Sequence, residues 1–313
     1  MPQSEPEEIA RAAELIRQGG LVAFPTETVY GLGANALDET AVARIFEVKG
    51  RPKTSPLIVH VASIDMARVI VGEWPQAAEK LGSRFWPGPL TLVLRRHLRI
   101  PLVVTAGLDT VGIRVPAHPV AQALLRQAGV PIAAPSANRF TELSPTTAEH
   151  VCEGLGGQVD CVLDGGPSAV GLESTVLSLA EEPPSILRPG MISKEEIEAV
   201  IGPVMVGAAP AAGAAHASPG QHPRHYSPRT PLEIIEDGAF PAGRGAYLFR
   251  THPSAAAAHN VSMPETADGY AAALYSTLHD LDRQAWDWIG IEPPPETPEW
   301  AAVVDRLRRA CRK

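Results

Sequence analysis

Leu21-Val22-Ala23-Phe24-Pro25-Thr26-Glu27-Thr28-Val29-Tyr30-Gly31-Leu32-Gly33 joins an apolar run to a segment rich in hydroxyl groups and glycine. Residues 21–24 are apolar throughout, which predicts a short buried strand. Threonines and glycines at the end of a strand can hold a polar ligand against exposed backbone N–H groups. We therefore expect a ligand site where this strand ends.

A cationic turn, Lys49-Gly50-Arg51-Pro52, follows further along the chain, with Ser55 and a second predicted strand over residues 57–61 after it. Arginine binds oxyanions through two parallel donors, and lysine acts as a mobile point charge. Two cations at alternate positions of an extended loop can contact two parts of one polyanion. Exposed surface cations are the alternative, but the neighbouring hydroxyl- and glycine-rich segment favours an anionic, phosphorylated ligand.

Polar groups follow another predicted strand in Ala133-Ala134-Pro135-Ser136-Ala137-Asn138-Arg139. Ser136 and Asn138 place a hydroxyl and an amide at alternate positions. Ser144 is the expected N-cap of the next helix, whose N-terminus can also attract an anion.

Arg114 lies inside a predicted strand over residues 111–115. A buried arginine is costly without a partner, so we expect Arg114 to face a carboxylate of the protein or of a ligand. Residues 171–176 and 187–190 add two further polar segments. Each segment is a weak signal alone, and their joint presence is a strong one.

Strand and helix patterns alternate along the chain, which is typical of an α/β protein. Several strands are joined by short turns, so we expect a twisted mixed sheet. Composition shifts after residue 202, and the alanine- and glycine-rich run that follows is typical of a linker. We predict three parts: a domain over residues 1–202, a linker over 203–230 that folds over the site, and a smaller α/β domain over 231–313. In the last part we expect a long helix over residues 268–288.

Composition limits the classes of function. The chain has 313 residues, 45% hydrophobic and 20% charged, which fits a soluble two-domain protein. Its formal charge of −8 argues against nucleic-acid binding as the main function. The basic runs over residues 95–99 and 306–313 are expected to be solvated faces, although weak RNA contact stays open. An acidic N-terminus and the lack of a membrane-spanning run predict a cytoplasmic protein.

Together these motifs resemble the Sua5/YrdC/YciO family, in its two-domain Sua5 form. The resemblance is carried by the segments PTETVYGLGANA, KGRPKTSPLIVH, FWPGPLTLVL, GIRVP, APSAN, SPTTAEHV, GLESTVLSL and ILRPG, and by the linker residues 218–228. It implies a YrdC-like sheet with a concave ligand cavity and a Rossmann-like C-terminal domain.

The resemblance also implies an activity. L-threonine, bicarbonate and ATP would give threonylcarbamoyl-adenylate and pyrophosphate, with Mg²⁺ bound to ATP and no metal held by protein side chains. A separate tRNA threonylcarbamoyltransferase system would then use the product to modify adenosine 37 of tRNA. The enzyme would thus be a nucleotidyltransferase that serves tRNA modification.

The resemblance assigns roles to individual residues. The catalytic signature would be Lys49, Arg51, Ser136 and Asn138. Threonine would be bound by Thr28, His60, Arg114 and Ser174, with Arg114 on its carboxylate. ATP would be bound by Arg51, Ser55, Thr110, Ser136, Ser144, Arg188 and Tyr226, with Tyr226 closing over the nucleotide.

The chain departs from the family pattern at a few positions. Ala134 stands where a threonine is frequent, Ser55 stands where an asparagine is common, and residues 140–143 replace a turn richer in glycine. No charged site residue is lost, so we expect activity. The alternatives are a nucleic-acid-binding module, which the negative charge disfavours, and another nucleotide-binding or carbamoyl-phosphate-type enzyme, which the linker and second domain disfavour.

Overall fold

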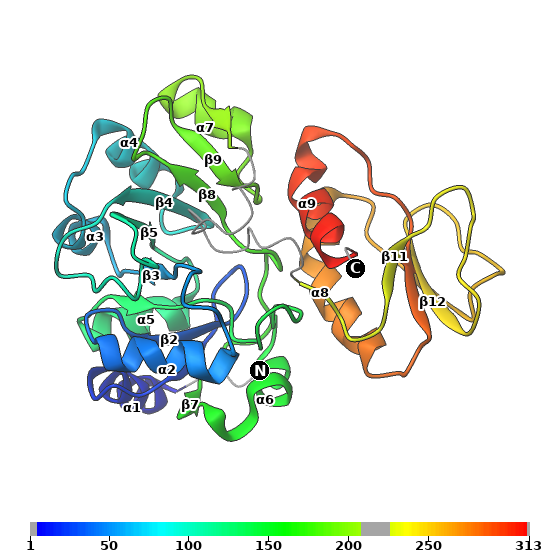
Figure 1. Cartoon of the computed structure of the whole chain (residues 1–313), viewed down its shortest axis with the longest axis horizontal. Coiled ribbons are helices and arrows are strands. Elements are labelled where there is room, and N and C mark those ends of the chain that lie inside the picture. The colour runs from blue at the N-terminus through cyan, green and yellow to red at the C-terminus, as the bar shows by residue number, and fades with distance from the viewer. Residues whose placement is uncertain (1–4, 208–225, 312–313) are drawn as a thin grey trace.

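The computed structural model describes residues 5–207 and 226–311, which form two sheets, each flanked by helices (Figure 1). The larger sheet has ten strands in the order β10-β9-β8-β4-β5-β3-β6-β2-β1-β7. Parallel and antiparallel neighbours are mixed in it, which confirms the predicted mixed sheet. Its strands are β1 (Val22–Phe24), β2 (Gly31–Asn35), β3 (Ile58–His60), β4 (Leu90–Arg95), β5 (Thr110–Arg114), β6 (Ile132–Ala133), β7 (Cys161–Val162), β8 (Thr175–Ser178), β9 (Ser185–Arg188) and β10 (Met205–Val206).

Helices cover both faces of this sheet. Leu21 and Ala23 point into a core shared with the helix α2, whereas Val22 and Phe24 point into a core shared with α1 and α5. Alternate residues of a strand face opposite sides, so a strand buried on both faces is apolar throughout. The helices of this part are α1 (Pro6–Arg17), α2 (Glu39–Lys49), α3 (Ile64–Ile70), α4 (Gln76–Phe85), α5 (Pro119–Ala128), α6 (Ala148–Leu155), η1 (Gly156–Gln158) and α7 (Lys194–Ile201).

Strand β2 was not predicted, because its glycines suggested a ligand-binding loop. The glycines are required by packing instead: a Cβ at Gly33 would come within 2.8 Å of the side chains of Phe24 and Ile132. The backbone of β2 therefore packs closely against β1 and β6. The turn that precedes it, residues 25–30, is the segment that faces the cavity described below.

The cationic turn is shaped by the end of α2. The Asp38 carboxylate accepts hydrogen bonds from the N–H groups of Thr40 and Ala41 and begins the helix. Gly50 ends it in the left-handed conformation, with φ at 60°. Lys49 is thus the last helical residue and Arg51 the second residue after it, so the two side chains leave the backbone in different directions.

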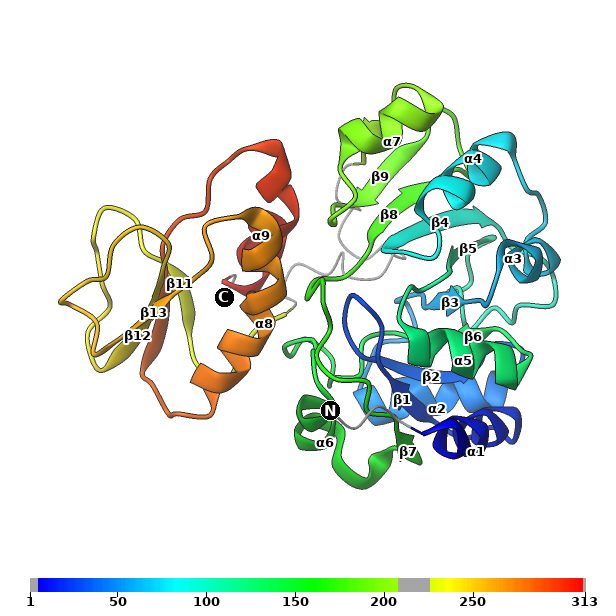
Figure 2. The same ribbon diagram turned by 180° about the vertical axis from the view of Figure 1, so that it is seen from behind.

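The smaller sheet has four parallel strands in the order β11-β14-β12-β13. Its helices α8 and α9 lie on the side that faces the larger domain, as the views from the front and from behind both show (Figures 1 and 2). This arrangement agrees with the expected Rossmann-like domain. Its elements are β11 (Leu232–Ile234), β12 (Gly245–Phe249), β13 (His259–Ser262), α8 (Ala267–Asp282), β14 (Trp288–Ile291), η2 (Pro298–Trp300) and α9 (Ala301–Ala310).

The prediction of a long helix over residues 268–288 was wrong at the C-terminal end of that helix. Helix α8 stops at Asp282, and Trp288 begins strand β14. A strand buried in the middle of a parallel sheet is a short apolar run, and such a run is easily joined to a preceding helix in a sequence pattern.

The predicted divisions at residues 202 and 230 stay predictions. Strand β10 comes after residue 202 and pairs with β9, and residues 208–225 of the predicted linker lie outside the described residues. In the part of the chain that the structure describes, no helix has the length and apolar character to cross a bilayer.

Candidate functional site

A cavity of about 50 Å³ lies where the turn after β1 meets the ends of β3, β5 and β9. Tyr226, the first residue of the second described range, forms part of its wall. The predicted site residues that line the cavity are Thr28, Arg51, His60, Arg114, Ser136, Ser174, Arg188 and Tyr226. Motifs far apart in the sequence thus converge on one cavity.

Lys49 and Asn138 lie behind the cavity wall. Lys49 Nζ donates hydrogen bonds to the carbonyl oxygens of Ser136, at 2.6 Å, and of Asn138. Asn138 Nδ2 donates to the carbonyl oxygens of Arg139 and Glu142, at 2.7 and 2.9 Å. In this structure Lys49 and Asn138 therefore brace the loop that presents Ser136. The catalytic assignment of both residues stays a prediction.

Burial lowers the pKa of Lys49 well below its usual range, and the nearby Arg51 lowers it further. The two carbonyl oxygens are the polar partners that replace water around the buried amine. Helix α2 is therefore tied at its C-terminus to the loop that carries Ser136.

Arg51 faces the cavity and is held in place by its own loop. Its Nη2 donates to Ser55 Oγ at 2.5 Å and to the Pro56 carbonyl at 3.0 Å. Ser55 thus orients Arg51 instead of lining the cavity. Burial, opposed by Tyr226 and aided by Arg188, lowers the pKa of Arg51 to about 10, so the guanidinium keeps its charge at neutral pH. Thr110, the first residue of β5, does not line the cavity, and its ATP role stays a prediction.

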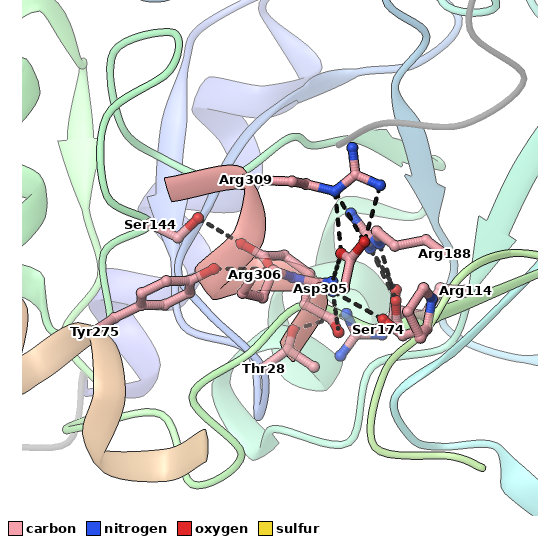
Figure 3. Close-up of polar contacts among 11 residues, drawn as sticks. Thr28, Arg114, Ser144, Ser174, Arg188, Tyr275, Asp305, Arg306 and Arg309 are labelled. Atoms are coloured by element: carbon pink, nitrogen blue, oxygen red, sulfur yellow. Dashed lines mark hydrogen bonds and ion pairs between the residues drawn. The ribbon is translucent and has the colours of Figure 1, made fainter. Parts of the chain in front are cut away.

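One end of the cavity is built around Arg114. Its guanidinium forms an ion pair with Glu27 at 2.7 Å, and its Nη1 donates to Thr28 Oγ1 at 2.8 Å (Figure 3). Its Nε donates to the Gly88 carbonyl at 3.1 Å. The prediction that Arg114 faces a carboxylate is confirmed, and the carboxylate belongs to the protein. These contacts use three of the five N–H groups of arginine, which leaves donors for a ligand.

His60 lies at the same end, 4% exposed. Burial, and then the charge of Arg114, lowers the pKa of His60 to about 3, so its ring is neutral at physiological pH. Among the described residues, no hydrogen-bond partner reaches its Nδ1. A buried polar atom of this kind needs a partner, and a hydroxyl or amine of a small ligand would supply one.

The other end of the cavity is built around Glu173. Its Oε1 accepts a hydrogen bond from Ser144 Oγ at 2.5 Å, and its Oε2 accepts from Arg306 Nε at 2.8 Å and from the Tyr275 hydroxyl at 3.3 Å. Burial alone would raise the pKa of Glu173, but Arg306, Arg188 and Ser144 together hold it below its ordinary value. Glu173 is therefore a carboxylate in the cavity wall.

Ser144 was expected to cap the next helix, and this was wrong. Thr147 is the N-cap of α6, and its side chain accepts from the His150 N–H. The Ser144 hydroxyl is turned instead toward Glu173. A serine three residues before a threonine gives two equally good capping signals, and only the three-dimensional position of Glu173 separates them.

Arg188, on β9, lines the cavity and contacts Ser174, which was predicted to bind threonine. Its Nε and Nη2 donate to the Ser174 carbonyl at 3.1 and 3.0 Å, and its Nη2 also reaches Ser174 Oγ at 3.2 Å. Ser174 Oγ is also 2.7 Å from Thr91 Oγ1. The hydroxyl of Ser174 is thus fixed between β4 and β9, where it lines the cavity.

Arg306 was missed because it belongs to a basic run that was expected to be solvated. It is 1% exposed and lies on the buried face of α9. The signal was present in the sequence, because Arg306 has helical spacing with the apolar residues Ala302, Val303 and Ala310. An arginine on such a face needs a buried carboxylate, which here is Glu173.

The Mg²⁺ expected with ATP stays a prediction. In residues 5–207 and 226–311, no group of three or more His, Cys, Asp or Glu side chains could hold a metal ion. Glu173, in the cavity wall, is paired with Arg306.

Two family models match adjoining parts of the chain. The Sua5/YciO/YrdC model, described as "Telomere recombination", matches residues 14–190. A second model, described as "Threonylcarbamoyl-AMP synthase, C-terminal domain", matches residues 192–311. The two matches together cover both sheets.

Similar proteins cover almost the whole chain. A protein of Pyrococcus abyssi named threonylcarbamoyl-AMP synthase is 44% identical over 96% of this chain and 92% of its own. A Bacillus subtilis protein of the same name is 45% identical over 97% of this chain and 93% of its own. Among solved structures, P. abyssi Sua5 complexed with L-threonine superimposes with a TM-score of 0.91 at 42% identity, covering 98% of this chain and 95% of that one.

Proposed function

The chain belongs to the Sua5/YrdC/YciO family, and from this premise we propose that it is an L-threonylcarbamoyladenylate synthase. The observation that carries the proposal is the composition of the cavity. It brings Arg114 and a neutral His60 into the same cavity as Arg51 and Arg188. Arg114 with His60 suits a small amino acid, and Arg51 with Arg188 suits phosphate groups.

Threonine fits the end built around Arg114. Its carboxylate would accept hydrogen bonds from the guanidinium N–H groups that Glu27, Thr28 and Gly88 leave available. The side-chain hydroxyl would pair with His60 Nδ1, which needs a partner. These two contacts would leave the amino group directed along the cavity toward the arginines of the other end.

The reaction needs no covalent enzyme nucleophile. The amine of threonine adds to the carbon of bicarbonate, and water leaves to give a carbamate. An oxygen of the carbamate then attacks the α-phosphorus of ATP, and the bond to the bridging oxygen breaks as pyrophosphate leaves. The overall step is a nucleotidyl transfer. The protein's part is alignment and stabilisation of the charge on the phosphates, for which Arg51 and Arg188 are placed.

Access to the cavity requires movement. A volume of about 50 Å³ is far below the roughly 300–1,000 Å³ of ordinary ligand pockets. ATP would therefore need part of the wall to move, and Tyr226 is the wall residue that the predicted linker over 203–230 supplies. A closed wall would then keep water from the labile carbamate. Mg²⁺ would arrive as part of the ATP complex.

Downstream steps follow from the chemistry of the product. Threonylcarbamoyl-adenylate would be passed to a separate tRNA-modifying system, which makes N6-threonylcarbamoyladenosine at position 37. We predict that the reaction takes place in the cytoplasm. Direct RNA binding by this chain would be weak and strongly salt-dependent, given the formal charge of −8.

The test is pyrophosphate release from ATP and bicarbonate, with and without L-threonine, and with L-serine as the control amino acid. We expect release that depends on threonine and is abolished in Arg51→Ala. Lys49→Ala should also lower the rate, through the loop that carries Ser136. A folded protein without threonine dependence would refute the proposal, and tRNA binding would then be the next measurement.

A further inference from the structure

The C-terminal domain contributes a buried charge to the wall of the cavity. Arg306, on α9, reaches across to Glu173 with its Nε at 2.8 Å and to the Pro189 carbonyl with its Nη2 at 3.1 Å. Its guanidinium carbon also lies 5.2 Å from the centre of the Tyr226 ring, within the range of a cation–π contact. Two wall residues, Glu173 and Tyr226, and the neighbour of a third, Arg188, thus contact one side chain of the other domain.

We propose that Arg306 is a positioning residue for the nucleotide end of the site, which makes the C-terminal domain a structural part of ATP binding. This inference rests on the proposed function, since it assumes that phosphates bind near Arg51 and Arg188. It assigns to the second domain a role in building the site, in addition to any role in covering it.

Electrostatics gives the first reason. Glu173 lines the same end of the cavity as Arg188 and would repel phosphate oxygens if its charge were uncompensated. Arg306 compensates it through a direct ion pair in which the two side chains are 1% and 9% exposed. Arg306 also forms an ion pair with Asp305, and Asp305 forms a second ion pair with Arg309 (Figure 3). These two ion pairs restrict the position of the Arg306 guanidinium.

Geometry gives the second reason. Arg306 contacts the carbonyl of Pro189, the neighbour of Arg188, and through Glu173 it fixes the hydroxyl of Ser144. Within the described residues, no hydrogen bond or ion pair joins Arg306 to Thr28, His60 or Arg114. Loss of Arg306 should therefore disturb ATP binding much more than threonine binding.

The experiment compares four variants of the full chain by calorimetry. Arg306→Met removes the charge, Arg306→Lys keeps it, and Arg306→Met combined with Glu173→Gln removes both members of the pair. The matched control is Arg308→Met on the same helix, because Arg308 is 61% exposed and its ion pair among the described residues is with the exposed Glu296. For each variant we would measure the Kd of Mg-ATP, the Kd of L-threonine and the melting temperature.

We expect Arg306→Met to weaken ATP binding about tenfold or more, with the Kd of threonine changed less than about twofold. Arg306→Lys and the double variant should bind ATP within about threefold of the parent, because neither leaves Glu173 as an unpaired charge. Arg308→Met should match the parent in every measurement.

The proposal is overturned if folded Arg306→Met binds ATP like the parent, or if it loses ATP and threonine binding equally. If Arg306→Met does not fold, the double variant decides: parent-like ATP affinity supports the proposal, and a tenfold loss overturns it. Because ATP binding is measured directly, the result does not depend on turnover. Failure of the proposed function would instead be seen as absent threonine-dependent pyrophosphate release in the unmodified chain.

Discussion

The two ends of the cavity contain the same interaction in two different settings. Arg114 pairs with Glu27 at 2.7 Å, and Arg306 pairs with Glu173 at 2.8 Å, and all four side chains are almost fully buried. The first pair lies within the ten-stranded sheet and its turns, whereas the second joins the two domains. The part of the cavity proposed for threonine is therefore complete in one domain, and the part proposed for the nucleotide is complete only when the domains are docked.

This difference separates the two binding events. A buried ion pair adds little net stability, but removal of one partner leaves an uncompensated charge at a high cost. Loss of the Arg114–Glu27 pair should lower the affinity for threonine, and changes at the domain interface should lower the affinity for ATP. Each prediction below tests whether that separation holds.

The largest effect is expected for Arg114→Met. The change removes the proposed partner of the threonine carboxylate and leaves Glu27 buried without its cation. We expect at least about a hundredfold loss of threonine affinity and a free energy of unfolding lower by about 3–5 kcal/mol. ATP affinity in the folded fraction should stay near that of the parent. Calorimetry and urea denaturation measure these quantities. An equal loss of affinity for threonine and for ATP would show that the two binding events are not separate.

A smaller effect is expected for Gly171→Ala at the domain interface. Gly171 has φ at +74°, and a Cβ there would lie 2.5 Å from the Ala271 carbonyl oxygen on α8. The added methyl would push the domains apart, on top of about 1–2 kcal/mol of backbone strain. ATP affinity should fall while threonine affinity is kept.

The control for this variant is Gly107→Ala. Gly107 has φ at +82° with no atom within 4 Å of the added Cβ, so it reports the backbone strain alone. ATP affinity should stay unchanged in the control. If both glycine variants lose ATP binding to the same degree, the effect comes from strain and not from domain docking.

The same separation explains what the sequence could reveal. Arg51, His60, Arg114 and Arg188 were found because each stands in a short motif at the end of a helix or in a strand. Glu173 and Arg306 were not recognised as partners, since 133 positions separate them and no local pattern joins them. The fold class was predictable from alternating patterns, whereas β2 and the end of α8 were set by packing against distant strands. Sequence reasoning therefore missed features that depend on contacts between distant segments, within one domain or between the two.

Acidic pH should lower the stability of the folded chain in part through a histidine at the domain interface. His279, on α8, is 3.2 Å from the Ser144 carbonyl oxygen and stacks on His150 at 3.9 Å. Burial, and then His150, lowers the pKa of His279 from 6.5 to about 4. The unfolded chain takes up this proton first, so stability is full above about pH 6.5 and falls as the pH drops toward 4.

The measurement is the urea midpoint at several values between pH 7 and pH 5, for the parent and for His279→Gln. Glutamine keeps a donor for the Ser144 carbonyl but does not titrate. A single histidine contributes at most about 1.4 kcal/mol per pH unit, so the variant should show a visibly flatter profile. Parallel profiles would mean that His279 does not set the pH response of the interface.

The smallest effect is expected for Arg283→Ala, which also cuts ion pairs between the domains. Arg283 lies after α8 and reaches Glu153 and Glu149 on α6 at 2.7 and 3.3 Å, but its side chain is 35% exposed and those of its partners 42% and 71%. Pairs of this kind contribute about 0.2–1 kcal/mol, because water screens them. The free energy of unfolding should fall by no more than that, and the Kd of ATP should not change. Arg283 and Arg306 bridge the same two domains, so an ATP defect in Arg283→Ala as large as that of Arg306→Met would mean that docking alone builds the nucleotide end. An unchanged Kd would instead mean that ATP binding depends on Arg306, whose guanidinium is buried against Glu173.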